Sequence, residues 1–228
     1  MAFVHLHTHT HYSILEGLPK PADYVKKAVE LKMKAVAITD TWNLHGCHEL
    51  YKLCRSEGIK PILGIEIFVR SSHQENLTHK LVLLAKSLKW YRNLIALASK
   101  GSLDNPGQTA CVEFDDLKIY NEDVVCLSGP ISWEIPYLIL SGKSDEDVVK
   151  RIQEYQDIYR QENYFLELLY HPDIPKQQLI TDKIVDIAKK YSIPLVACQN
   201  SYYIDKDDKL TQDVIMALWS GHEIENPS

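Results

Sequence analysis

Four histidines on alternate residues near the start of the chain could hold a metal ion. His5, His7, His9 and His11 lie in the stretch "FVHLHTHTHYSILEG". Successive side chains of a β-strand point to opposite faces, so alternate histidines of a strand place their imidazoles on one face. Imidazole combined with carboxylate ligands suits Zn, Mn or Fe. The pattern therefore predicts the beginning of a metal site, which needs further ligands from other strands.

Carboxylates appear further along at positions where such ligands would be expected. Glu16 follows the histidines, Asp40 ends the apolar run "KAVAIT", and Glu66 interrupts "GIEIFV". Mixed histidine and carboxylate clusters of two or three metals act on phosphoryl oxygens. A complete cluster needs roughly eight or nine ligands if each ion is to keep an open position. Strong candidates occur only in the first third of the chain, which favours an incomplete cluster.

The apolar period switches between two and 3.6 along the chain, which predicts alternating strands and helices. The expected strands are 3–6, 34–39, 60–69 (with a bulge or break at Gly64), 80–85, 124–129, 164–169 and 194–198. The expected helices are 22–31, 47–57, 88–100 (ending at Gly101), 133–140, 145–160, 177–191 and 209–219. We expect residues 102–123 to be the least regular part.

Strands that alternate with helices predict right-handed βαβ units and a parallel sheet. About seven strands in one domain favour a closed or distorted barrel over an open sheet. Barrel chemistry collects at the carboxyl ends of the strands, which is where His7, His9, Glu16 and Asp40 would lie. A length of 228 residues fits one domain of this kind.

Composition excludes several classes of protein. No apolar run approaches the ~20 residues of a membrane span, and no secretory signal is visible. We therefore expect no membrane partner and a cytoplasmic location. The five cysteines are odd in number and form no C-x-x-C pair, which indicates reduced intracellular thiols. The net charge of −6 repels a phosphate backbone, and no aromatic-rich basic stripe is present, so we expect no autonomous DNA binding.

Six segments resemble one family in order and spacing. "FVHLHTHTHYSILEG", "AVAITDTWNLHG", "GIKPILGIEIFV", "LLAKSLKWYRNLIALASK", "LSGPISWEIPYLIL" and "LVACQNSYYI" resemble the PHP (polymerase and histidinol phosphatase) domain. The resemblance is greatest to the PHP domain that opens the alpha subunit of bacterial DNA polymerase III. It implies an α/β fold, a distorted (β/α)7-type barrel. It also implies a single PHP domain over residues 1–228, as an N-terminal fragment of a larger replicative polymerase subunit.

The resemblance also assigns metal-ligand positions one by one. The residues that match a family ligand are His7, His9, Glu16 and Glu66. At the other positions the ligand is replaced, by Thr41, Lys80, Pro130, Asn200 and Tyr202. His79 lies one residue before Lys80, and a shift of one residue along a strand turns a side chain to the opposite face.

These losses imply a catalytically silent PHP domain that acts as a structural and protein-interaction module in DNA replication. Its partners would be a proofreading exonuclease subunit and the polymerase portion of the parent chain, which would be a nucleotidyltransferase. We expect no bound metal; a retained ion would be Zn, Mn or Mg on the four matching residues. Two alternatives stay open. One is a metal-dependent phosphoesterase or 3′–5′ proofreading exonuclease with a reduced metal site, and the other is a free-standing histidinol-phosphatase-like enzyme.

Overall fold

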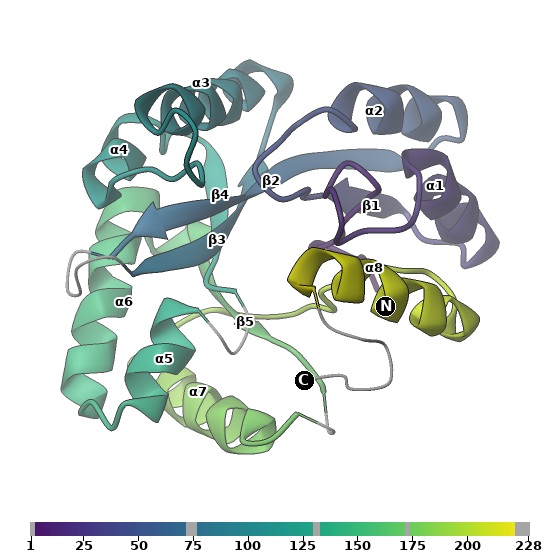
Figure 1. Ribbon diagram of the computed structural model, residues 1–228. Helices are drawn as coiled ribbons and strands as arrows, with labels where there is room; N and C mark the ends of the chain where they lie inside the picture. Colours follow the sequence, from purple (N-terminus) through teal and green to yellow (C-terminus); the bar gives the residue numbers. More distant parts are fainter. Residues whose placement is uncertain (1–2, 72–76, 130–132, 172–173, 222–228) are drawn as a thin grey trace. The chain divides into compact units, whose positions relative to one another are not determined.

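The computed structural model describes residues 3–71, 77–129, 133–171 and 174–221 (Figure 1). The chain forms two compact units, Met1–Ile65 with Gln199–Ser228, and Glu66–Cys198. The boundary lies inside strand β2 (Lys60–Arg70), so each unit is described by itself. The single domain expected over residues 1–228 stays a prediction.

The first unit contains β1, the start of β2, and helices on either side of them in the sequence. Its elements are α1 (Pro21–Glu30), β1 (Ala35–Ile38), α2 (Cys47–Ser56), the 3-10 turn η2 (Lys206–Asp208) and α8 (Lys209–Ser220). All four residues of β1 are buried, as expected for a strand inside a parallel pair. β1 pairs in parallel with β2, Ala35 opposite Lys60 and Ile38 opposite Leu63.

Residues 3–6 do not form the regular strand that the alternation predicts. The segment still runs beside β1: the His5 carbonyl accepts from Ala37 N–H at 3.0 Å, and the Thr8 carbonyl accepts from Thr39 N–H at 3.0 Å. Side chains replace the remaining ladder bonds, because Thr8 N–H donates to the Thr39 hydroxyl oxygen (2.9 Å) and the Thr8 hydroxyl donates to the Ala37 carbonyl (2.7 Å). Threonine hydroxyls commonly compete with backbone pairing in this way.

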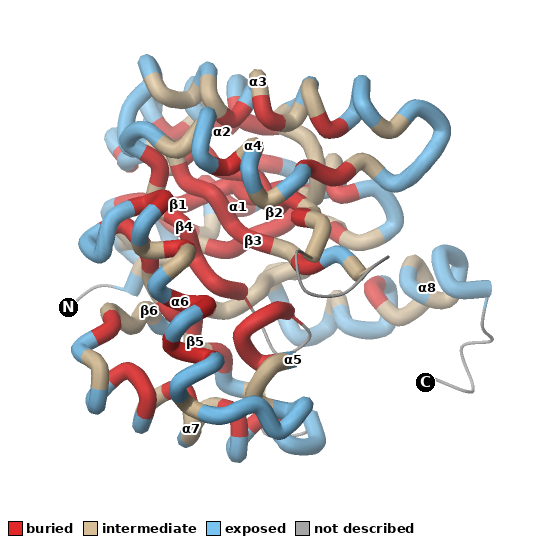
Figure 2. The backbone as a smooth tube through the Cα atoms, turned by 90° about the vertical axis from the view of Figure 1, so that its left-hand side faces the viewer, coloured by how far each residue is buried: buried red, intermediate tan, exposed pale blue. Residues whose placement is uncertain are grey.

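The second unit contains the end of β2, four further strands and most of the helices. The strands β3 (Thr78–Ala85), β4 (Val124–Leu127), β5 (Tyr164–Leu168) and β6 (Leu195–Ala197) follow β2 in that hydrogen-bonded order. The helices are α3 (Leu88–Asp104), α4 (Phe114–Ile119), α5 (Glu134–Leu140), α6 (Asp145–Tyr159), α7 (Gln177–Tyr191) and the 3-10 turn η1 (Gln161–Asn163). Figure 2 shows β3 and β4 as largely buried tube.

The expectation of an all-parallel sheet is wrong for strand β3. β4–β5 and β5–β6 are parallel, but β3 runs antiparallel to β4, with Val82 opposite Leu127. Only residues 71–77 separate β2 from β3, and a parallel crossover needs a dozen or more residues. The described part of the chain contains six strands, one fewer than expected because residues 3–6 are irregular.

Three local expectations also need correction. α3 continues through the buried Gly101 to Asp104, since one helix glycine costs only about 1 kcal/mol relative to alanine. β2 likewise continues through Gly64. Helix α4 forms inside 102–123, where Glu113 N–H donates to the Asp116 carboxylate at 3.0 Å as part of a capping box.

None of the helices in the described residues is both long enough and apolar enough to cross a membrane. The longest helix there is α3, with 17 residues, short of the ~20 that a bilayer requires.

Candidate metal centre

The first unit brings two of the four alternate histidines together. His7 and His9 are both fully buried, and their ring centroids lie 5.2 Å apart. His5 is half-buried and His11 is exposed. The expectation of four imidazoles on one face therefore fails, because residues 3–11 do not continue as one regular strand.

Ser13 and Asp40 fix the orientation of the His9 ring. Asp40 accepts three hydrogen bonds, from Thr10 N–H (2.6 Å), the Thr10 hydroxyl (2.8 Å) and the Ser13 hydroxyl (2.7 Å). Burial raises the pKa of Asp40 above its usual value, and these hydrogen bonds act in the opposite direction. Three converging donors are what an ionised carboxylate requires.

The tautomer of His9 follows from that network. The Ser13 hydroxyl gives its proton to Asp40, so its oxygen accepts from Thr41 N–H and from His9 Nδ1, each at 3.0 Å. His9 therefore carries its proton on Nδ1 and keeps a lone pair on Nε2. Metal-binding histidines are oriented by this kind of hydrogen bond on the other ring nitrogen.

Glu16 is held by Thr41, which stands where the resemblance predicts a histidine ligand. The Thr41 hydroxyl donates to Glu16 Oε2 at 2.6 Å and lies 3.4 Å from His9 Nδ1. The loop that carries Glu16 closes through Gly17, whose N–H donates to the Ser13 carbonyl at 2.9 Å. A Cβ at Gly17 would lie 2.2 Å from the Thr10 carbonyl oxygen, so only glycine fits this turn.

Asn200 and Tyr202, the last two positions where the resemblance predicts a ligand, belong to the same unit as His9. The Tyr202 ring stacks on the His9 ring, with centroids 4.2 Å apart and planes inclined by 6°. Asn200 donates from its amide to the Tyr202 hydroxyl at 3.2 Å. Backbone pairing holds this segment in place, because His9 N–H donates to the Ser201 carbonyl at 2.8 Å.

The fourth predicted ligand, Glu66, belongs to the second unit. Its side chain is 1% exposed, and Glu66 Oε1 lies 2.6 Å from the Lys80 ammonium of β3. The ammonium also lies 5.1 Å from the centroid of the Phe68 ring. His79 is buried, and its ring lies 5.9 Å from that of Tyr137 on α5. Lys80 is thus the β3 side chain that pairs with Glu66, and Pro130 lies outside the described residues.

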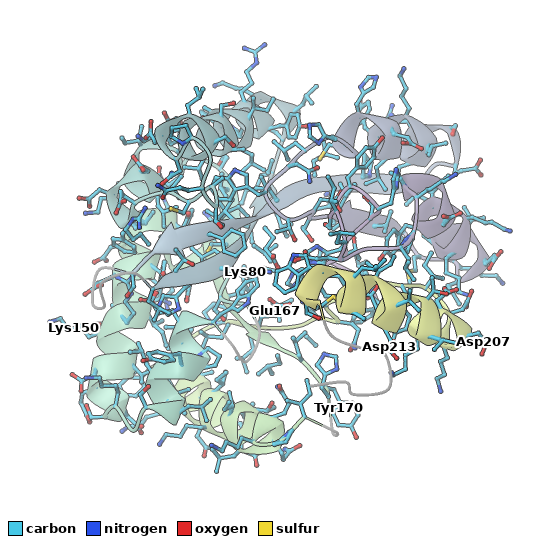
Figure 3. All side chains as sticks on the ribbon, in the orientation of Figure 1. Lys80, Lys150, Glu167, Tyr170, Asp207 and Asp213 are labelled. Carbon is cyan, nitrogen blue, oxygen red and sulfur yellow. The ribbon has the colours of Figure 1, made fainter. Side chains whose placement is uncertain are left out.

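One further buried carboxylate of the second unit, Glu167, was not among the predicted site residues. Glu167 on β5 is 2% exposed, and its N–H donates to the Ser128 hydroxyl at 3.1 Å. Burial, together with the charge of Glu167, raises the pKa of the Cys198 thiol. Figure 3 labels Glu167 together with Lys80. The signal was present in "YFLELL", where a single acid interrupts an apolar strand as Glu66 does in "GIEIFV".

The comparisons with known proteins agree on one family. The model of the PHP domain matches residues 5–171. The DNA polymerase III subunit alpha of Borreliella burgdorferi is 34% identical over 227 residues, which is 96% of this chain, and that of Treponema pallidum is 30% identical over 236 aligned positions, covering all of it. This chain spans about a fifth of the length of these relatives, 20% of each.

A solved structure gives the same result for the fold. A protein of Bifidobacterium adolescentis, provisionally assigned as a metal-dependent phosphoesterase, superposes with a TM-score of 0.60 at 14% identity. The match covers 88% of this chain and 87% of that one. It confirms the predicted α/β fold, a distorted (β/α) barrel. Together with the match over residues 5–171, it shows that this chain belongs to the PHP domain family and resembles the PHP region of DNA polymerase III alpha subunits.

Proposed function

We propose that this chain is the PHP domain of a bacterial replicative DNA polymerase III alpha subunit that has lost its metal cluster. It acts as a structural and protein-interaction module in DNA replication. The relatives named above support the family, and the residues at the lost ligand positions support the loss of hydrolysis.

The observation that carries this proposal is the hydrogen bond from Thr41 to Glu16. At position 41 the family has a histidine ligand, and here a hydroxyl donates to a retained ligand at 2.6 Å. Threonine supplies neither an imidazole lone pair nor a carboxylate charge. In the same unit Tyr202 stands at another ligand position and covers a face of His9.

A cluster of two or three metals does not fit these residues. Four of nine family positions keep a good ligand, His7, His9, Glu16 and Glu66, whereas each ion of a cluster needs about three protein ligands. Glu16 and Glu66 already use a carboxylate oxygen for Thr41 and Lys80. These residues therefore do not support a hydrolytic step that depends on a metal cluster.

The proposed partners are inferred from the relatives, which are DNA polymerase III alpha subunits. We propose that the domain supports the polymerase portion of the longer chain, which would carry the nucleotidyltransferase activity, and offers a surface to a separate proofreading exonuclease. The net charge of −6 is consistent with protein partners and with no autonomous DNA binding.

The test is a hydrolysis assay on the purified chain. We expect no cleavage of p-nitrophenyl phosphate or of a labelled DNA 3′ end with Mn²⁺ or Zn²⁺. Elemental analysis should find less than one equivalent of metal, and a chelator should leave the melting temperature unchanged. Cleavage that His9→Ala abolishes, and that the control His48→Ala on the exposed side of α2 retains, would overturn the proposal.

A second candidate is a phosphoesterase or 3′–5′ exonuclease with a single residual ion. The observation that favours it is the buried His7–His9 pair, in which His9 keeps its Nε2 lone pair. Such an ion would be Zn, Mn or Mg, with Glu16 of the same unit as a further ligand. When bound, it would polarise a phosphoryl oxygen and activate a water. The same assay separates the two candidates, because only this one predicts metal that co-purifies and activity that depends on His9.

A further inference from the structure

We propose that the Lys80 ammonium is the built-in cation of the second unit, which neutralises Glu66 permanently where the family uses divalent metal. The inference rests on the proposed function and adds a stabilising role that the loss of a ligand alone does not give. Glu66 is buried to 1% side-chain exposure and Lys80 to 22%, with 2.6 Å between Glu66 Oε1 and Lys80 Nζ.

A carboxylate this deeply buried needs a compensating charge. Transfer of an isolated ionised group into the interior is strongly unfavourable, and removal of one partner of a buried pair is far more costly than loss of a surface pair. A lysine ammonium is a compact point charge with three donors on a flexible stem. The Phe68 ring, 5.1 Å away, faces the same ammonium and favours a cation at this place.

The same unit contains a second buried acid that pairs with a cation. Glu134 of α5 is 4% exposed and lies 2.9 Å from Arg151 of α6, which is 3% exposed. Surface pairs are different, as in Lys118–Asp115, where the side chains are 58% and 83% exposed. Glu66 and Glu134 are thus two buried acids of this unit that each pair with a cation from a neighbouring element, and Lys80 is that cation for Glu66.

The first experiment is a set of melting curves for Lys80→Met, Glu66→Gln and the double variant. Lys80→Met should lower the melting temperature by roughly 10 °C. The double variant removes both charges and should recover at least half of that loss. Lys118→Met, from the exposed pair, is the matched control and should shift the melting temperature by less than about 1 °C. A Lys80→Met variant that melts like wild type, or a double variant with additive losses, would refute the inference.

The second experiment asks whether metal can replace the ammonium. Lys80→Ala leaves Glu66 without its cation and opens space beside it. Addition of Zn²⁺ or Mn²⁺ should raise its melting temperature by several degrees and leave wild type unchanged. If neither ion stabilises Lys80→Ala, the ammonium does not stand in for a metal. Metal bound to wild type would instead contradict the proposed function, so the two failures are distinguishable.

Discussion

The two units differ in the kind of contact that satisfies a carboxylate at a predicted ligand position. Each has a carboxylate at a predicted ligand position, and in each a residue at a position where the predicted ligand is replaced contacts that carboxylate. In the first unit the contact is neutral, from the Thr41 hydroxyl to Glu16 at 2.6 Å. In the second it is ionic, from Lys80 to Glu66, also at 2.6 Å.

Burial explains why the two contacts differ. Glu16 is half-buried and reaches solvent, so a hydroxyl suffices to satisfy one oxygen. Glu66 is fully buried and needs a full positive charge. The depth of a retained acid therefore decides whether its new partner can be neutral, and this explains why different residue types stand at positions 41 and 80.

The largest expected difference is in the coupling energies of the two contacts. A double-mutant cycle on Lys80→Met and Glu66→Gln should give about 3 kcal/mol in the free energy of unfolding. The parallel cycle on Thr41→Val and Glu16→Gln should give about 1 kcal/mol. Both come from urea unfolding curves. Equal couplings in the two cycles would remove the distinction between the units.

A substitution at Gly17 tests the backbone that positions Glu16. Gly17→Ala should destabilise the protein by about 2 kcal/mol, because its Cβ would lie 2.2 Å from the Thr10 carbonyl. The control is Gly58→Ala in the same unit, where φ is +69° and nothing lies within 4 Å. That change should cost about 1 kcal/mol through backbone strain alone. A cost at Gly17 no larger than at Gly58 would mean that the loop adjusts freely.

Ser13→Ala tests the hydrogen-bond network of the first unit. It removes a donor to Asp40 and the acceptor for His9, both at hydrogen-bond distance (2.7 and 3.0 Å). We expect a loss of about 1.5 kcal/mol, and a change in the ¹⁵N shifts that report which ring nitrogen of His9 is protonated. Ser56→Ala, exposed on α2, should be close to neutral. A His9 tautomer that does not change would show that Ser13 does not set it.

The smallest effect concerns the pH dependence of the first unit. Burial lowers the pKa of His5 below its usual 6.5, so the folded state favours the neutral ring. The contribution of neutral His5 to the free energy of unfolding is therefore complete above pH 6.5 and is lost as pH falls through the lowered pKa. Glutamine does not titrate, so the difference in free energy of unfolding between His5→Gln and wild type should become smaller as pH falls from 7.5 to 5.5. If this difference does not change with pH, burial does not lower the pKa of His5.

Regular elements with clear periodicity could be predicted from the sequence. The helix expected over 177–191 is α7 with the same bounds, because its apolar spacing and polar flanks agree. The segment 3–6 could not be predicted, since the hydroxyls of Thr8 and Thr39 replace ladder bonds only once the tertiary fold brings them together. The antiparallel pairing of β3 with β4 could not be predicted, because a run of apolar residues does not show strand direction.

The residues of the candidate site could be predicted from the sequence, but the contacts between them could not. The histidine pair, Glu16 and Glu66 stand out from their apolar surroundings, and the replacements at 41 and 80 can be read by position. Which replacement contacts which ligand depends on burial and side-chain reach. Ser13 gives no signal of its own, although it contacts both Asp40 and His9.

The stack of Tyr202 on His9 makes this pair a natural spectroscopic reporter. An aromatic ring 4.2 Å away and nearly parallel places the imidazole protons in its shielding cone. Their resonances should therefore lie upfield of those of an exposed histidine such as His48. Because the two residues come from opposite ends of the sequence, a shift of the His9 signals would report loosening of the first unit long before the protein unfolds.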